Sequence, residues 1–300
     1  MRLRQRLHTY EKLTRLDKPI GVLLLMWPTL WALWLSSYGS PNPEVAVVFV
    51  VGVILMRSAG CVINDVADRN FDIHVERTRD RPLPAKLIST KEALLLATGL
   101  ILLAFLLVLQ LNALTVKLSV AALALAAIYP FLKRFFWLPQ AWLGVAFGFG
   151  IPMAFAAHHN HIVPLAWALL AANVFWAIAY DTEYAMVDRD DDIKLGLKSS
   201  AILFGRFDVA GVMACHASFL LILAYIGWWA RLGISYVLGV LIAAILAGYQ
   251  YRLIRARARE NCFRAFLSNN LMGAAIFGGI VVDFILRDPL LAGSPVILPR

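Results

Sequence analysis

The sequence is poor in charged residues and in cysteine. Charged residues make up 16% of the 300 positions, against about 25% in a typical soluble domain, while 61% are hydrophobic and the mean hydropathy is +0.72. This composition excludes an ordinary soluble globular protein. The three cysteines, Cys61, Cys215 and Cys262, are far apart and form no CxxC pair, so neither a zinc motif nor a disulfide framework is indicated.

Long apolar runs instead indicate an all-α polytopic membrane protein. Several runs reach about 18 residues, enough to cross a hydrocarbon core about 30 Å thick at about 1.5 Å per residue. We expect nine transmembrane helices, over residues 20–37, 45–63, 93–110, 113–131, 139–157, 163–181, 209–229, 233–251 and 267–286. No small-residue cleavage site follows the first run, so residues 1–19 are expected to form a basic segment at the membrane interface.

The cations are distributed unevenly between the two sides that this topology defines. The side of the N-terminus holds 23 of the 28 Lys and Arg residues, which predicts that this side is cytoplasmic. The net charge of +9 therefore indicates membrane topology, and nucleic acid is not expected as a partner.

Two acidic clusters interrupt the apolar runs, and each contains three aspartates at helical spacing. The members are Asp65, Asp68 and Asp72 in the first cluster, and Asp181, Asp188 and Asp192 in the second. If the preceding helix continues, each set lies along one face, where like charges repel unless a cation lies between them. Carboxylates that leave room for water and phosphate oxygens suit Mg²⁺. The alternative is that both clusters are solvated loop faces paired with nearby arginines.

Cations and hydroxyl groups suited to phosphate surround these clusters. Arg57 lies within an apolar run, where contact with lipid would be costly, so it is expected to face an internal cavity. Tyr129 and Lys133 are about one helical turn apart at the end of another run, although interfacial anchoring is an alternative for them. Together these groups predict a site for a metal-bridged diphosphate that carries an apolar tail.

The two acidic clusters are separated by four spans and lie on the same side. This predicts two pseudo-equivalent halves of four helices each, with a ninth helix appended, within a single domain over residues 1–300. The loops 64–92 and 182–208 are expected to form the cytoplasmic side of the active site.

Several motifs together resemble the UbiA superfamily of intramembrane prenyltransferases. They are Asn64-Asp65-x-x-Asp68-x-x-x-Asp72, the three aspartates of the second cluster, and Tyr129-x-x-x-Lys133. Three longer runs, over residues 16–21, 27–34 and 180–192, resemble the sequences of those family members that prenylate 4-hydroxybenzoate. The resemblance covers nearly the whole chain.

The resemblance implies that two Mg²⁺ ions bridge a polyprenyl diphosphate, whose prenyl group is transferred to the 3-position of 4-hydroxybenzoate in ubiquinone biosynthesis. The metal ligands would be Asp68, Asp72, Asp188 and Asp192, supported by Asn64 and Asp65, and Asp191 is a further catalytic candidate. Substrate contacts would come from Arg57, Asn64, Tyr129, Lys133, Asp181 and Lys198, with Arg134 pairing with the acceptor carboxylate. The bacterial inner membrane would be the location.

Two other functions are compatible with the same residues. A relative with the same mechanism would use another aromatic acceptor, such as a naphthoate or homogentisate. A cation-coupled transporter would also place carboxylates in a helical bundle, but usually near the bilayer midplane, whereas these acids lie at span ends. The sequence does not determine the prenyl chain length or the oligomeric state.

Overall fold

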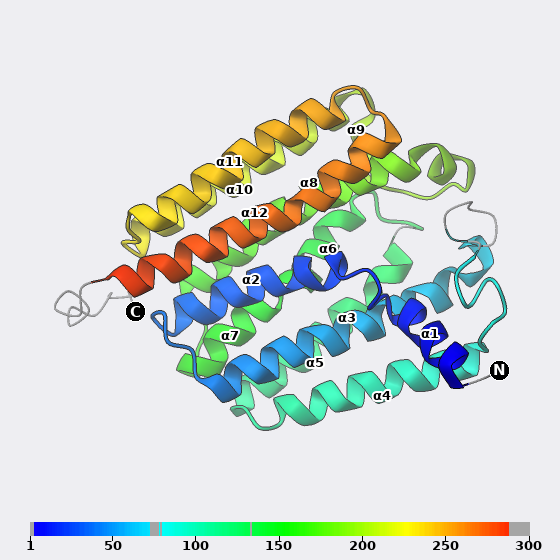
Figure 1. The fold of residues 1–300 in the computed structure, drawn as a ribbon, viewed down its shortest axis with the longest axis horizontal. Coiled ribbons are helices and arrows are strands. Elements are labelled where there is room, and N and C mark those ends of the chain that lie inside the picture. Colours follow the sequence, from blue (N-terminus) through cyan, green and yellow to red (C-terminus); the bar gives the residue numbers. More distant parts are fainter. Residues whose placement is uncertain (1–2, 73–77, 79, 133, 288–300) are drawn as a thin grey trace.

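The structure is a computed structural model that describes residues 3–72, 78, 80–132 and 134–287, and helices are its only regular elements there. Figure 1 shows the long helices lying side by side, with the described part of the chain starting and finishing at opposite ends of the bundle. The elements are α1 (Leu3–Thr14), α2 (Ile20–Ser36), α3 (Pro43–Asp72), α4 (Thr90–Val108), α5 (Ala113–Leu132), α6 (Pro139–Gly148), α7 (Gly150–His159), α8 (Pro164–Lys194), α9 (Ser200–Phe204), η1 (Gly205–Phe207), α10 (Asp208–Trp229), α11 (Ile234–Ile254) and α12 (Arg259–Leu286).

The predicted all-α, multi-pass membrane architecture is confirmed. Eight helical segments in the described chain are long and apolar enough to cross a membrane, with α6 and α7 together forming one of them, and α2 is a shorter apolar helix. The segment of α6 and α7 is interrupted at Phe149. Pro152 has no amide hydrogen to donate to the Gly148 carbonyl, so the helix cannot continue through this point without loss of a hydrogen bond.

Two helices extend well past the predicted spans. α3 has 30 residues and α8 has 31, so each is about 45 Å long, which exceeds the hydrocarbon thickness by roughly 15 Å. The segments 64–92 and 182–208, predicted as loops, therefore begin as helix. α12 likewise begins at Arg259, before the predicted residue 267. These polar extensions can continue as helix in water, where pairs such as Arg264 and Glu260 form one turn apart.

Large buried aromatic side chains fill the core between α2, α8, α10 and α12. Trp31, Trp176 and Phe219 are fully buried, and their ring centroids lie 5.2 Å apart for the two tryptophans and 5.6 Å apart for Trp176 and Phe219. The Trp31 Nε1 group donates to the Gly273 carbonyl at 3.1 Å, and that of Trp176 donates to Asn269 Oδ1 at 2.9 Å. Each indole therefore contributes apolar area without an unsatisfied N–H group.

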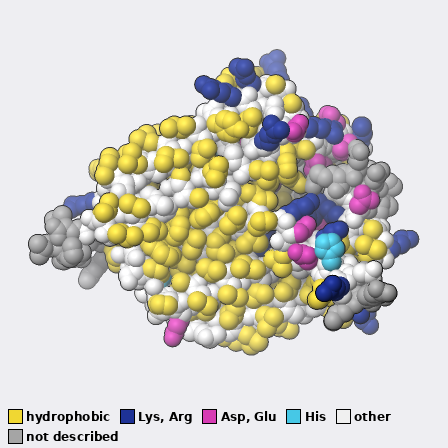
Figure 2. Space-filling view, viewed as in Figure 1, with side chains coloured by type: hydrophobic (Ala, Val, Ile, Leu, Met, Phe, Trp, Pro, Cys, Tyr) yellow, Lys and Arg dark blue, Asp and Glu magenta, His cyan; other side chains and the backbone are white. Residues whose placement is uncertain are grey.

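The outer surface separates into an apolar belt and a charged end. Figure 2 shows apolar side chains over the middle of one face, and cations and carboxylates gathered at the end that holds α1. Exposed side chains on the outer helices include Leu102 and Leu106 of α4 and Leu241 and Ile245 of α11. A surface of this kind suits contact with lipid, because it would expose a large apolar area in water.

The N-terminal helix α1 packs against the bundle at the charged end. Leu13 is fully buried in a small cluster with residues of α3 and α4, and Tyr10 donates a hydrogen bond to Glu92 at the start of α4. Arg6 pairs with the same carboxylate at 2.9 Å. The predicted basic segment is thus also a wall of the bundle, and its contact with the membrane interface stays a prediction.

Candidate active site

A cavity of about 1050 Å³ opens among α1, α2, α3, α5, α6 and α8, and α4 contributes to its apolar part. Its wall changes from charged residues near α1 to apolar residues in the interior. The apolar part includes Val48, Phe49, Phe105, Leu123 and Phe147. This arrangement fits a ligand with an ionic head and a long apolar tail, because each part meets a wall of matching polarity.

The helix α3 brings part of the first acidic cluster to this cavity. Arg57, Asn64 and Asp68 all line it. Their spacing of seven and four residues places them along one face of the helix. The described residues do not include the side chain of Asp72 or any part of Lys133, so the roles of these two residues stay predictions.

Asp65, which was predicted to lie along the same face as Asp68 and Asp72, is not part of the cavity wall and binds two arginines. It is 1% exposed, and its Oδ1 accepts hydrogen bonds from Arg15 at 2.6 Å and from Arg81 at 3.1 Å. Burial lowers the pKa of the Arg15 guanidinium, but the Asp65 carboxylate together with Cys61 and Tyr184 raises it by more, so the pKa lies above its usual value. Both arginines line the cavity, and Asp65 therefore holds two cations at its wall.

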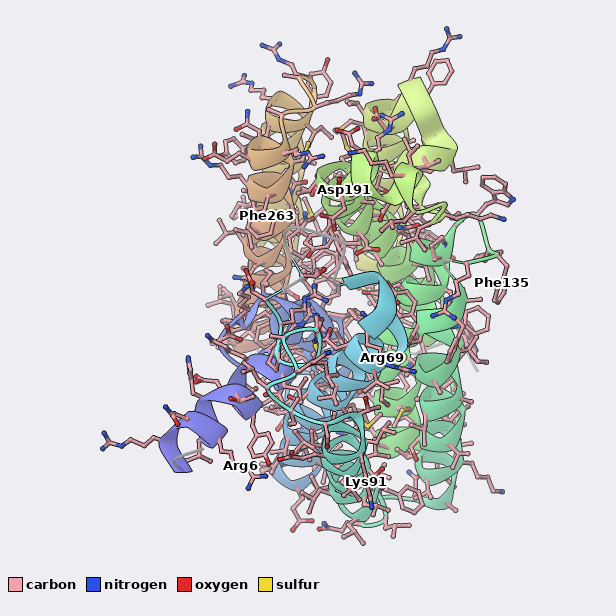
Figure 3. All side chains as sticks on the ribbon, turned by 90° about the vertical axis from the view of Figure 1, so that its right-hand side faces the viewer. Arg6, Arg69, Lys91, Phe135, Asp191 and Phe263 are labelled. Atoms are coloured by element: carbon pink, nitrogen blue, oxygen red, sulfur yellow. The ribbon has the colours of Figure 1, made fainter. Side chains whose placement is uncertain are left out.

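The helix α8 brings the second cluster to the facing wall. Asp181, Asp188 and Asp192 line the same cavity as Asn64 and Asp68. The structure therefore brings together two acidic sets that are more than a hundred residues apart in the sequence. Figure 3 looks onto this end of the molecule, where the end of α8, marked by Asp191, lies apart from the end of α3, marked by Arg69.

Other carboxylates of the second cluster pair with cations outside the cavity wall. Arg259 donates to Asp190 at 3.1 Å. Asp191, which was predicted to be catalytic, lies 3.8 Å from both Lys194 and Arg259. The cluster is therefore divided into carboxylates that line the cavity and carboxylates that bind cations at the rim.

Arg57 reaches the cavity interior in a constrained position. A Cβ atom added at Gly21 would lie 2.5 Å from its Nη2 atom, and its guanidinium lies 5.7 Å from the centroid of the Phe147 ring. In the described part of the chain, Arg57 Nε and the Tyr180 hydroxyl are buried polar atoms with no hydrogen-bond partner. Because buried polar groups are nearly always hydrogen-bonded, these two fit the oxygen atoms of a ligand.

The remaining predicted substrate contacts differ in their placement. Tyr129 and Lys198 line the cavity. Lys198 also donates to the Phe135 carbonyl at 3.0 Å and lies 4.2 Å from the Trp137 ring centroid, so it anchors the turn between α5 and α6. Arg134 does not line the cavity, and it donates to the Ala67 carbonyl at 3.0 Å.

The donor set fits a hard divalent cation that shares its ligands with a substrate. Asp68 and Asn64 from one helix and Asp188 and Asp192 from another offer oxygen atoms only, which are the ligands Mg²⁺ prefers. Among the described residues, however, no three Asp, Glu, His or Cys side chains lie close enough to hold a metal ion by themselves. This agrees with the usual behaviour of Mg²⁺, which takes one or two carboxylates together with water and phosphate oxygens.

Some residues of the cavity wall were not singled out by sequence reasoning. They are Lys12, Arg15, Gln140, Tyr180 and Tyr184. The only signal for Arg15 was its place beside the 16–21 motif, because its pairing with Asp65 depends on the packing of α1 against α3. Gln140 is 4% exposed and accepts a hydrogen bond from the Ser200 amide at 3.0 Å, so it joins α6 to the start of α9.

These features define a polytopic membrane protein with a cavity for an ionic head group and an apolar tail. The model of the UbiA prenyltransferase family matches residues 25–273, and the chain belongs to this family. It is 61% identical over 287 residues to a 4-hydroxybenzoate octaprenyltransferase of Nitrosospira multiformis, covering 96% of this chain and 99% of the relative. A protein of the same name from Thiobacillus denitrificans is 62% identical, with 96% and 98% covered.

Solved structures share the fold. A UbiA homolog from Aeropyrum pernix K1 superposes with a TM-score of 0.77 at 25% identity, covering 87% of this chain and 97% of that chain. A UbiA homolog from Archaeoglobus fulgidus bound to GPP and Mg²⁺ has a TM-score of 0.66 at 18% identity, with 91% and 99% covered. The helical arrangement is therefore that of the family.

Proposed function

We propose that this protein transfers a polyprenyl group from polyprenyl diphosphate to the 3-position of 4-hydroxybenzoate and releases diphosphate, a step of ubiquinone biosynthesis. The observation that carries the proposal is the meeting of the two aspartate sets from α3 and α8 in one cavity whose interior is apolar. The relatives named 4-hydroxybenzoate octaprenyltransferase, at about 60% identity over nearly the full chain, support the choice of acceptor.

Mg²⁺ is the proposed cofactor. Asp68, Asp188, Asp192 and Asn64 would hold it, with Asp72 as a further predicted ligand. When bound, the cation neutralises negative charge on the diphosphate and so makes it a better leaving group.

The protein's own cations hold and stabilise the diphosphate. Arg57 donates to its oxygen atoms from inside the cavity, and the Tyr180 and Tyr129 hydroxyl groups lie in the same wall. The allylic C–O bond breaks as negative charge collects on the diphosphate, and fixed donors stabilise this charge without reorganisation. Phe147 and the other apolar residues keep water from the allylic carbocation.

The aromatic acceptor then attacks the carbocation. The ring carbon ortho to the phenol hydroxyl forms the new C–C bond, and loss of the proton from that carbon restores aromaticity. Asp188 and Asp192 are the proposed bases because they line the cavity, whereas Asp191 pairs with Lys194 and Arg259. Lys12, Arg15, Lys18 and Arg81 lie in the cavity wall and offer partners for the acceptor carboxylate.

The proposed location is the inner membrane of a bacterium, with the N-terminus and both acidic clusters on the cytoplasmic side. The charge asymmetry supports this orientation, because 23 of the 28 Lys and Arg residues fall on that side. The diphosphate donor and the water-soluble acceptor would both reach the cavity from the cytoplasmic end.

The test is product formation in isolated membranes that contain the overexpressed protein. Octaprenyl diphosphate, 4-hydroxybenzoate and Mg²⁺ are supplied, and the prenylated product is identified by mass spectrometry. We expect product that disappears with EDTA and with Asp68→Ala, while Arg264→Ala, at the exposed start of α12, retains activity. If product forms from homogentisate or a naphthoate but not from 4-hydroxybenzoate, the proposed acceptor is wrong, while the proposed mechanism stands.

A further inference from the structure

A buried carboxylate outside the cavity joins three cytoplasmic segments. Asp208, the first residue of α10, is fully buried. Its Oδ2 accepts a hydrogen bond from Arg189 of α8 at 3.0 Å. Arg257, from the turn between α11 and α12, donates from Nε to both carboxylate oxygens at 2.9 and 3.0 Å, and from Nη2 to Oδ1 at 2.7 Å. The hydrogen bond with Asp208 raises the pKa of Arg257.

Arg189 is the cation of interest because it lies within the second acidic cluster. Asp188 precedes it directly, and Asp190, Asp191 and Asp192 follow. On a helix, successive residues are about 100° apart, so the Arg189 side chain leaves α8 in a different direction from that of Asp188. The contact with Asp208 agrees with this geometry, and Arg189 does not line the cavity.

Without a partner at Asp208, Arg189 would have other carboxylates within reach. Residues three apart on a helix are neighbours, with Cβ atoms about 5–6 Å apart, so Arg189 and Asp192 form a favourable pair. A guanidinium binds a carboxylate in the same oxygen positions that a divalent cation requires. Asp190 and Asp191 pair with Arg259, and Asp192, three residues after Arg189 on the helix, is an acceptor within reach of a released Arg189.

We propose that Asp208 is a positioning residue for the second aspartate cluster: by binding Arg189 outside the cavity wall, it keeps this guanidinium from competing with a divalent cation for Asp188 and Asp192. The proposal rests on the proposed function, because it assumes that the cation binds at these two aspartates. Arg257 has a supporting part, since it fixes the orientation of the carboxylate that receives Arg189.

The critical variant is Asp208→Asn. Asparagine is neutral and offers one acceptor oxygen where aspartate offers two, so Arg189 and Arg257 no longer share a charged acceptor and Arg189 is held less tightly. The measurement is Mn²⁺ binding to the full-length protein in detergent with inorganic diphosphate, followed by the EPR signal of free Mn²⁺. We expect the dissociation constant to rise about tenfold, as for other residues that orient metal ligands. The Mg²⁺ concentration that gives half-maximal prenyl transfer is expected to rise with it.

The double variant Asp208→Asn/Arg189→Gln separates positioning from simple support of the fold. Removal of the released guanidinium is expected to restore the Mn²⁺ affinity to within about threefold of the wild type, because the two sites interact. Arg257→Gln is the matched control: it removes a partner of Asp208 but leaves Arg189 bound, so it should lower the melting temperature without weakening Mn²⁺ binding.

The outcomes are distinguishable. Unchanged affinity in Asp208→Asn, or equal loss in the single and double variants, would overturn the proposal and leave the proposed function standing. A wild-type protein that does not bind Mn²⁺ with diphosphate would overturn the metal dependence itself. If Asp208→Asn does not fold, Arg189→Gln alone decides: wild-type affinity supports the proposal, and a tenfold loss contradicts it.

Discussion

At the scale of single residues, two aspartates of the charged end act as partners for arginines. Asp65 binds Arg15 and Arg81, and Asp208 binds Arg189 and Arg257. Each carboxylate is almost completely buried, and each links segments that are distant in the sequence. A buried carboxylate is stable only with such partners, so loss of the arginines would leave an uncompensated charge.

Asp65 and Asp68 are therefore expected to respond differently to the same substitution. Asp68→Asn should reduce kcat at least a hundredfold with little change in melting temperature, because the side chain lines the cavity. Asp65→Asn should lower the melting temperature and raise the KM for polyprenyl diphosphate, because Arg15 and Arg81 lose a charged partner. Steady-state kinetics with a thermal melt of each variant make the comparison. Equal kinetic defects with equal stability would assign Asp65 to the metal site.

Gly21 is expected to control the position of Arg57. A Cβ atom there would lie 2.5 Å from Nη2 and 2.6 Å from Nε of Arg57, so Gly21→Ala forces the guanidinium to move. We expect the KM for polyprenyl diphosphate to rise about tenfold, which corresponds to about 1.4 kcal/mol of binding. Gly99→Ala is the control, since a Cβ atom there meets nothing within 4 Å. Kinetics of Gly21→Ala that match those of Gly99→Ala would show that Arg57 does not bind the donor.

At the scale of elements, a buried polar network joins α8 to α12. The Asn269 side chain donates to Glu183 at 2.8 Å and accepts from Trp176 at 2.9 Å, and all three residues are fully buried. His216 of α10 lies 3.7 Å from the same glutamate. The network therefore ties together the helices that surround the second aspartate cluster.

Asn269→Ala should lower the stability of the protein by about 2 kcal/mol or more. The substitution leaves the Trp176 N–H group and one Glu183 oxygen without their partner, and each unsatisfied buried group costs about 1–3 kcal/mol. Thermal unfolding in detergent measures the effect. Arg264→Ala, on an exposed turn of the same helix, is the control and should change the melting temperature little. A stable Asn269→Ala variant would show that water or a rearranged side chain replaces the amide.

At the scale of the whole molecule, the orientation in the membrane is testable with the protein's own cysteines in place. All three are buried, so they should not react with a membrane-impermeant maleimide. Ser40, between α2 and α3, and Lys86, between α3 and α4, are both exposed and lie at opposite ends of α3. Ser40→Cys should be labelled from outside in spheroplasts, and Lys86→Cys only in inverted vesicles. The reverse pattern would invert the predicted topology.

Much of this molecule follows from its sequence alone. Hydropathy determined the all-α membrane fold, because each apolar run must satisfy its backbone hydrogen bonds internally and is long enough to cross the bilayer. Helical spacing predicted one face for Asp65, Asp68 and Asp72 and another for Asp181, Asp188 and Asp192. All three of the second set line the cavity, whereas in the first set Asp68 lines it and Asp65 does not. Both expectations depend on local periodicity, which the sequence contains in full.

The tertiary structure decided which charged groups meet. Asp65 and Asp191 lie in the same acidic clusters as Asp68 and Asp192, which line the cavity. Asp65 and Asp191 do not line it, and they bind arginine or lysine. Arg15, Arg81 and Arg259 come from the turn after α1, the loop before α4 and the start of α12, and no local sequence pattern predicts these contacts. Only Lys194 is a local partner, three residues from Asp191. A carboxylate's role depends on the charge that packing places beside it, and packing brings together residues that are remote along the chain.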